Sequence, residues 1–309
     1  MNQPPSRIDL GGLSLTVLDG GTFRLDGAAL YGIYPRVFWE KLNHPDADNR
    51  VMLGISPAVV TGPEGCLLID PGIGSGWGDH ARDRYDLQGQ RPLEEMLAEA
   101  GVNPDEVGTI VATHLHFDHV AGAVAGEAIT GGDLSDPRLL SEGLLGQLEP
   151  ALPEARLVVQ RAEFEAAEAP DLRTAQYVAG AVARVYEREG RFDLIDGDVE
   201  PMPGVRLELT GGHTPGHQVI WIEGRDQTLL LAGDLIPTTS HVRSEVLEGV
   251  DVEPAVSARV KAALLARAAE RNAWLGFYHA PRVRWGRIRA GAAGAYKIEE
   301  TETVPSRRR

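Results

Sequence analysis

The stretch THLHFDHVAG, residues 113–122, constrains the fold of this chain more than any other. It directly follows the apolar run TIVA (109–112), which is typical of a buried strand. Three histidines and one aspartate therefore fall where a strand leaves the core. Buried ionisable groups need a compensating charge, and a divalent cation supplies one. We therefore expect a metal site at the end of this strand.

The spacing within this stretch suggests how the ligands are presented. In an extended chain, side chains two residues apart project to the same side. His114, His116 and Asp118 are thus predicted to point into one space, and the following turn is predicted to bring His119 there. Imidazole and carboxylate ligands suit zinc, iron, manganese or cobalt, and no thiol lies nearby. A surface-exposed, histidine-rich turn is the alternative.

Three later stretches also place an ionisable residue at the end of a β-type run. GGHTPGH puts His213 in a glycine-rich loop, LLLAGD ends on Asp234, and WLGFYHAP carries His279. Each residue alone has an ordinary interpretation as a loop or turn residue. Their joint occurrence favours one shared site. His217, which closes GGHTPGH, is expected to support a ligand or to pack nearby, because ligating histidines need hydrogen-bonded partners.

The hydrophobic pattern predicts an α/β protein built from two packed sheets flanked by helices. Strand-rich blocks surround and separate the helices instead of alternating with them, which disfavours a doubly wound parallel sheet. Pro170 is expected to interrupt the second helical stretch. No repeat or linker divides the chain, so residues 1–309 are predicted to form a single domain. The β-type runs are 13–18, 57–62, 66–70, 109–113, 155–159, 205–210, 218–223 and 228–233, and the helical stretches are 91–100, 160–188 and 253–273.

Charge and hydropathy restrict the partners. The net charge of −15 should repel polyanions, so neither nucleic acid nor an anionic membrane is an expected partner. No apolar run approaches the roughly 18 residues that a membrane span requires. The first residues also lack the basic and apolar regions of a secretory signal. We expect a soluble cytoplasmic protein that acts on a small molecule.

The four motifs together resemble the metallo-β-lactamase superfamily, whose pattern is H-x-H-x-D-H, a later histidine loop, a strand-terminal aspartate and a final histidine. The resemblance implies a four-layer αβ/βα sandwich with two mixed β-sheets flanked by helices. It also implies two divalent metal ions, with zinc preferred and iron, manganese or cobalt as alternatives. By this resemblance one ion is bound by His114, His116 and His213, the second by Asp118, His119 and His279, and Asp234 bridges both.

The segment GGTFRLDGAALYGIYPRVFWEKLN (20–43) resembles the quorum-quenching N-acyl-homoserine lactonase branch, and it is also similar to methyl-parathion-hydrolase-like proteins. The resemblance implies opening of lactone rings, foremost N-acyl-homoserine lactones, by a hydroxide that bridges the metals. Asp118 and Asp234 would then be catalytic. Hydrolysis of phosphotriesters or aryl esters is the alternative within this fold. An iron-dependent sulfur dioxygenase or related redox protein is the alternative from a different class.

One position departs from the branch. Many homoserine lactonases carry a tyrosine three residues after the bridging aspartate, where this chain has Pro237. The group that polarises the substrate carbonyl is therefore open. An N-terminal extension of about residues 1–50 is expected to line the substrate pocket or to form a homodimer interface. The residues predicted to contact substrate are Tyr31, Tyr34, Phe38, Phe117 and His241.

Overall fold

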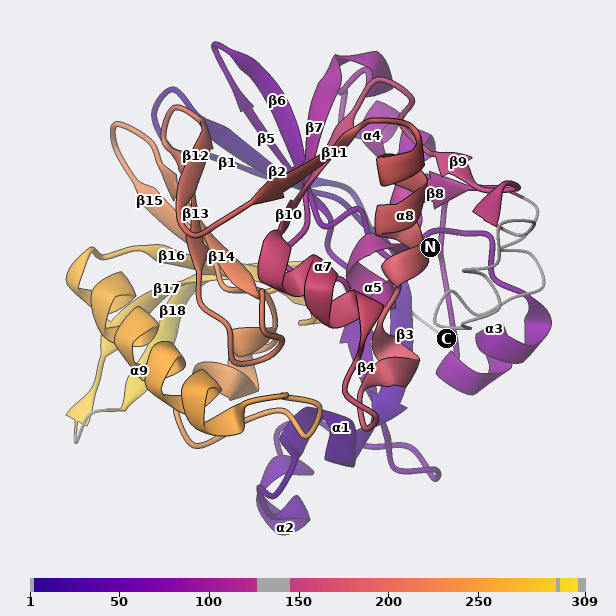
Figure 1. The fold of residues 1–309 in the computed structure, drawn as a ribbon. Helices are drawn as coiled ribbons and strands as arrows, with labels where there is room; N and C mark the ends of the chain where they lie inside the picture. Colours follow the sequence, from indigo (N-terminus) through magenta and orange to yellow (C-terminus); the bar gives the residue numbers. More distant parts are fainter. Residues whose placement is uncertain (1–2, 127–144, 293–294, 305–309) are drawn as a thin grey trace.

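Two seven-stranded sheets form the centre of the protein in a computed structural model that describes residues 3–126, 145–292 and 295–304 (Figure 1). The first sheet has the order β1 (Ser6–Asp9), β2 (Ser14–Val17), β5 (Ala58–Gly62), β6 (Gly65–Ile69), β7 (Val107–Val111), β10 (Arg156–Gln160) and β11 (Phe192–Ile195). The second has the order β12 (Val199–Met202), β13 (Val205–Leu209), β14 (Gln218–Glu223), β15 (Thr228–Leu231), β16 (Trp274–Gly276), β17 (Val283–Ala290) and β18 (Tyr296–Thr303).

Both sheets are mixed. Strands β6, β7, β10 and β11 run parallel, as do β15 and β16, and the other neighbours within these sheets are antiparallel. Apolar side chains of the two inner faces pack together, for example Leu67 and Val60 in the first sheet and Leu207 and Ile220 in the second. Burial of these side chains is the main force that holds the sheets face to face. The prediction of two packed sheets is thus confirmed.

Helices cover the outer faces of both sheets (Figure 1). Helices α4 and α8 pack on the first sheet, and α9 packs Leu264, Leu265 and Ala268 on the second. The layers therefore follow the order helix, sheet, sheet, helix. The α-helices are α1 (Gly27–Tyr31), α2 (Arg36–Trp39), α3 (Asp79–Tyr85), α4 (Leu93–Glu99), α5 (Phe117–Val120), α7 (Arg161–Glu168), α8 (Gly180–Arg188) and α9 (Pro254–Glu270).

Short elements complete the described part of the chain. Strand β3 (Thr22–Asp26) pairs with β4 (Arg50–Gly54), and β8 (Val124–Ala125) pairs with β9 (Glu149–Pro150). The 3-10 helices are η1 (Pro104–Glu106), η2 (Ala121–Ala123), η5 (Ala175–Tyr177), η6 (Gly233–Leu235) and η7 (Thr239–Val242). Among the residues that the structure describes, none of the helices has the length and apolar character needed to cross a bilayer.

The long helical stretch 160–188 is interrupted as predicted. Helix α7 ends at Glu168, two residues before Pro170, and α8 begins at Gly180. The C-terminal hairpin of β17 and β18, in contrast, was not predicted. Strand β18 has the sequence YKIEETET and is mostly exposed, so it lacks the apolar alternation by which strands are recognised. Strand β18 therefore forms because it pairs with β17 in the folded protein, and not because of a local sequence pattern.

Candidate metal centre

Four loops meet at one edge of the two sheets and carry the seven predicted ligands. The first follows β7, the second connects β13 to β14, the third follows β15 and the fourth follows β16. Each loop begins where an apolar strand leaves the core, so its polar side chains are held at the margin of the packed interior. All seven side chains are buried, with exposed fractions of 0–5%: His114, His116, Asp118, His119, His213, Asp234 and His279.

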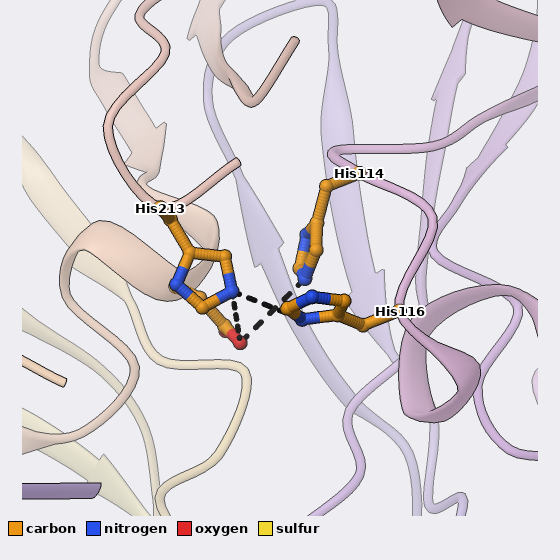
Figure 2. Close-up of side chains that lie close together, drawn as sticks. His114, His116 and His213 are labelled. Atoms are coloured by element: carbon orange, nitrogen blue, oxygen red, sulfur yellow. Dashed lines mark hydrogen bonds and ion pairs between the residues drawn. The ribbon is translucent and has the colours of Figure 1, made fainter. Parts of the chain in front are cut away.

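These side chains form two groups that share one carboxylate. Asp234 directs Oδ2 toward Nε2 of His114 at 3.7 Å and of His213 at 3.5 Å. Its other oxygen, Oδ1, faces Nε2 of His119 at 3.3 Å and of His279 at 3.4 Å. Figure 2 shows the imidazoles of His114 and His213 directed at one carboxylate oxygen, with His116 beside His213. Asp234 therefore lies between the two groups and offers one oxygen to each.

The remaining two side chains complete the groups. His116 brings Nδ1 to 3.1 Å from Nε2 of His213 (Figure 2). Asp118 brings Oδ2 to 3.3 Å from Nε2 of His279. One group of possible metal ligands thus comprises His114, His116, His213 and Asp234, and the other comprises Asp118, His119 and His279.

The predicted alternation of side chains is wrong beyond His116. His116 is extended, with φ −73° and ψ 148°, but α5 begins at Phe117. A helix turns successive side chains by about 100°, so Asp118 and His119 leave the strand pattern and face the second group. The helical turn is the reason that one short motif serves two groups of ligands.

Four of the five imidazoles, all except that of His116, are oriented from behind by hydrogen bonds to their Nδ1 atoms. Such a bond fixes the ring and its tautomer and leaves Nε2 for a metal. The acceptor differs in each case and comes from a different part of the fold. Nδ1 of His119 lies 2.9 Å from Oδ2 of Asp70, Nδ1 of His213 lies 2.9 Å from Oδ1 of Asp251, Nδ1 of His279 lies 2.9 Å from the carbonyl oxygen of Gly54, and Nδ1 of His114 lies 3.0 Å from Oγ1 of Thr113.

The electrostatics of His114 and Asp234 suit a cation. Burial, followed by the neighbouring imidazoles, lowers the pKa of His114 well below its usual value. Burial alone would raise the pKa of Asp234, but His119 and His279 hold it well below its usual range. Neutral imidazoles and an ionised carboxylate are the forms that bind metal. The Nε2 atom of His114 is also buried without a hydrogen-bond partner, so the donor set fits bound divalent ions.

His217 supports the loop that carries the shared aspartate. Its Nε2 accepts a hydrogen bond from the main-chain N–H of Asp234 at 3.3 Å, and its Nδ1 lies 2.8 Å from Oγ1 of Thr210. Gly233 has φ +51°, and a Cβ there would come within 2.6 Å of Nε2 of His217. Glycine therefore permits both the backbone turn and the close approach of the imidazole.

Several supporting residues were not foreseen from the sequence. Asp70 follows the apolar strand β6 and accepts hydrogen bonds from the main-chain N–H and the hydroxyl of Thr113, both at 2.7 Å. Its position after a buried strand is the same signal that identified Asp234. Glu248 and Asp251 approach Nδ1 of His213 at 3.2 and 2.9 Å from a loop more than 30 residues away, and no sequence pattern marks them.

Two of the predicted substrate contacts are occupied by other interactions. The Tyr31 hydroxyl lies 2.9 Å from Oγ of Ser240, and its ring stacks between Trp39 and His241. Nε2 of His241 donates to the carbonyl oxygen of Leu30 at 2.9 Å, which assigns Nδ1 as an acceptor toward Thr238. Both side chains are fully buried.

The other three predicted contacts differ in exposure. Phe117 is buried and packs its ring against Phe23, Trp77 and Tyr85. Tyr34 is half-buried, with Nη1 of Arg243 3.5 Å from its hydroxyl. Phe38 is 53% exposed on α2.

We expect His241 to make stability depend on pH. Burial, then the charge of Lys261, lowers the pKa of His241 to about 3. Below pH 6.5 the unfolded chain binds a proton that the folded protein does not, so the free energy of unfolding falls by about 1.4 kcal/mol per pH unit. His241→Gln removes this contribution. The stability advantage of the wild type over this variant should shrink by about 2 kcal/mol between pH 7 and pH 5.

Urea unfolding of the metal-free proteins at the two pH values measures this difference. His80→Gln is the matched control, because His80 is exposed and should give the same difference from wild type at both pH values. If wild type and His241→Gln lost equal stability on acidification, the interpretation of His241 as a buried neutral imidazole would be wrong.

A cavity of about 520 Å³ lies beside His116. Helix α7 and the segment before α8 line one side, and Thr214, Pro215 and Val252 line the other. Most of its lining side chains are small or apolar, such as Ala166 and Val178. A cavity of this size and character next to polar ligands is the usual form of a small-molecule site.

Comparisons with known proteins agree with this arrangement. The Metallo-beta-lactamase superfamily matches residues 53–128 and 143–275. The crystal structure of a probable metal-dependent hydrolase from Staphylococcus aureus is similar, with 25% identity, a TM-score of 0.80, and coverage of 96% of this chain and 100% of that one. The structure of AidC, a dizinc quorum-quenching lactonase in complex with a product, covers 97% of this chain and 98% of its own at 18% identity and a TM-score of 0.73.

Curated proteins with similar sequences include N-acyl homoserine lactonases. An N-acyl homoserine lactonase of Bacillus thuringiensis is 30% identical over 167 residues, which are 53% of this chain and 53% of the relative. The chain thus spans about half the length of the curated relatives it matches. The family match covers most of the chain and includes six of the seven residues of the two ligand groups, all except His279. The chain belongs to the metallo-β-lactamase superfamily.

Proposed function

We propose that this protein is a metal-dependent hydrolase that opens lactone rings, with N-acyl-homoserine lactones as its principal substrates. The observation that carries the proposal is the position of Asp234, which offers one carboxylate oxygen to each of two groups of buried ligands. Two adjacent metal sites are a recurring arrangement in hydrolases that activate water. The similarity to N-acyl homoserine lactonases supports the choice of substrate.

The first ion would be held by His114, His116 and His213, the second by Asp118, His119 and His279, and Asp234 would contact both. Nitrogen and oxygen ligands without thiolates favour zinc, while iron, manganese and cobalt accept the same donors. When bound, such ions lower the pKa of water and polarise carbonyl oxygens. A mononuclear sulfur dioxygenase would use fewer of these ligands, so the metal content separates the two classes.

In lactone hydrolysis, water adds its hydroxyl to the acyl carbon, the ring C–O bond breaks and the leaving oxygen gains a proton. We assign the delivery of that proton to the Asp118 carboxyl, because it is buried within the second group of ligands. Its backbone is fixed by the Tyr278 hydroxyl, which donates to the Asp118 carbonyl oxygen at 2.7 Å. The Tyr278 ring also stacks on His119, with centroids 4.1 Å apart. Tyr278 therefore positions two members of the group.

The acyl chain of the substrate would enter the cavity beside His116. Its walls of alanine, proline and valine side chains suit an alkyl chain, because small-molecule sites are mostly apolar with few polar anchors. Tyr31, Tyr34 and His241 are the candidates to replace the tyrosine absent at Pro237, and among them Tyr34 has the least engaged side chain. Within the described part of the chain, the Tyr34 hydroxyl has only the long 3.5 Å contact with Arg243, whereas Tyr31 and His241 are engaged elsewhere.

Proton release by metal-quantified protein acting on a long-chain N-acyl-homoserine lactone tests the proposal, with metal-stripped protein as the control. We expect turnover that rises with metal content and reaches its maximum near two ions per chain. Two bound ions without turnover would exclude the lactone and direct the test to phosphotriesters and aryl esters. One ion per chain at saturation would contradict the two-metal arrangement itself.

A further inference from the structure

Glu163 is a buried carboxylate that lies outside both groups of ligands but touches two of the loops that carry them. Glu163 is the third residue of α7, and only 4% of its surface is exposed. One carboxylate oxygen accepts a hydrogen bond from the main-chain N–H of Leu115 at 2.9 Å. The other accepts from the main-chain N–H of Gly216 at 3.1 Å.

The two amides belong to loops from different sheets. Leu115 lies between His114 and His116 in the loop after β7, which leaves the first sheet. Gly216 follows His213 by three residues in the loop between β13 and β14 of the second sheet. One carboxylate therefore joins the two loops across the edge where the sheets meet. Buried main-chain N–H groups need a hydrogen-bond acceptor, and the Glu163 carboxylate is the acceptor for one such group in each loop.

Gly216 shows how closely the two parts approach. A Cβ at this position would lie 2.1 Å from the main-chain nitrogen of Glu163. The start of α7 thus packs directly on the backbone of the histidine loop, which leaves little freedom for the loop to shift. Nearby, Gln160 donates to Oε1 of Gln218 at 2.9 Å and extends the junction between the sheets.

We propose that Glu163 is a positioning residue that sets the relative placement of the two histidine loops and thereby the affinity of the first metal group. That group takes His114 and His116 from one loop and His213 from the other, so its geometry depends on the relative position of the two loops. The second group takes no ligand from the β13–β14 loop. Loosening the junction should therefore weaken one ion more than the other. This inference rests on the proposed two-metal site and deepens it.

Glu163→Gln is the direct test because it preserves shape but replaces one acceptor oxygen with an NH₂ group. One buried backbone N–H then loses its acceptor and faces another donor. The measurement is a titration of the metal-free protein with Zn²⁺ against a competing chelator. We expect one of the two ions to bind 10- to 100-fold more weakly, as is typical when a supporting partner of a ligand is lost. The other ion should retain its wild-type affinity, and excess Zn²⁺ should restore full occupancy.

Glu95→Gln is the matched control. Glu95 is also the third residue of its helix, α4, but it is exposed, so both ions should bind as in wild type. If Glu163→Gln does not fold, Glu163→Asp serves instead, because the shorter side chain cannot reach both amides. Thermal unfolding of the metal-free variants measures any separate effect on the fold.

Three results have distinct meanings. Selective weakening of one ion supports the proposal. Wild-type affinity for both ions, or equal weakening of both together with a less stable metal-free fold, overturns it and leaves Glu163 a structural residue. A wild-type protein that binds fewer than two Zn²⁺ ions would instead contradict the proposed two-metal function.

Discussion

Replacing Asp234 by asparagine is expected to lower lactone hydrolysis at least about 100-fold, because residues that merely support a metal ligand already account for 10- to 100-fold. Asp234 faces His114 and His213 with one oxygen and His119 and His279 with the other. An amide removes the negative charge and one of the two acceptor oxygens. We expect metal content to fall from two ions per chain to one or fewer, as measured by elemental analysis alongside the rate.

Asp105→Asn is a suitable control, because Asp105 lies exposed in η1, at the opposite end of β7 from the loop that carries His114. It makes the same chemical change and should leave both metal content and rate unchanged. An Asp234→Asn protein with two bound ions and full turnover would show that the shared-carboxylate assignment is wrong.

Removal of the metal ions should produce the largest change in stability. The ligand groups bring seven buried ionisable side chains together, and the bound ions would offset the cost of burying them. A ligand present at 1,000 times its dissociation constant stabilises the folded state by about 4 kcal/mol. Since 1 kcal/mol shifts the Tm of a large domain by roughly 2–4 °C, we expect the stripped protein to unfold at least about 10 °C lower.

Thermal unfolding followed by circular dichroism, with and without added Zn²⁺, measures this shift. Mg²⁺ at the same concentration is the control, because it prefers octahedral oxygen ligands and should restore little stability to a histidine-rich site. Equal Tm values for stripped and Zn²⁺-saturated protein would mean that the loops are held by protein contacts alone.

The candidate metal ligands could be predicted because they interrupt a hydrophobic pattern. His114 and Asp234 each stand three residues after a buried strand, where a polar residue has to leave the core or find a partner. This local conflict is visible in the sequence without knowledge of the fold. Asp70 gives the same signal after β6, and it proved to support His119 through a 2.9 Å contact.

Other parts of the site carry no such signal. Asp118 lies two residues after the extended His116, so alternation predicted it on the side of His114 and His116, but α5 turns it toward His279. A helix of four residues is too short for hydrophobic periodicity to reveal it. Asp251 reaches His213 from a loop 38 positions later, and that pairing depends on how α9 and its preceding loop dock on the second sheet.

The sequence by itself determined eight of the fourteen strands of the two sheets, the break in the helical stretch at Pro170 and the identity of the ligand candidates. Hydrophobic period and residue chemistry are local properties, so they can be read without coordinates. The grouping of the candidate ligands around Asp234 was expected only from the family resemblance, whereas the tertiary structure alone decided that α5 turns Asp118 toward His279 and that Glu163 joins Leu115 to Gly216. These are contacts between residues distant along the chain, and packing of the two sheets brings them together.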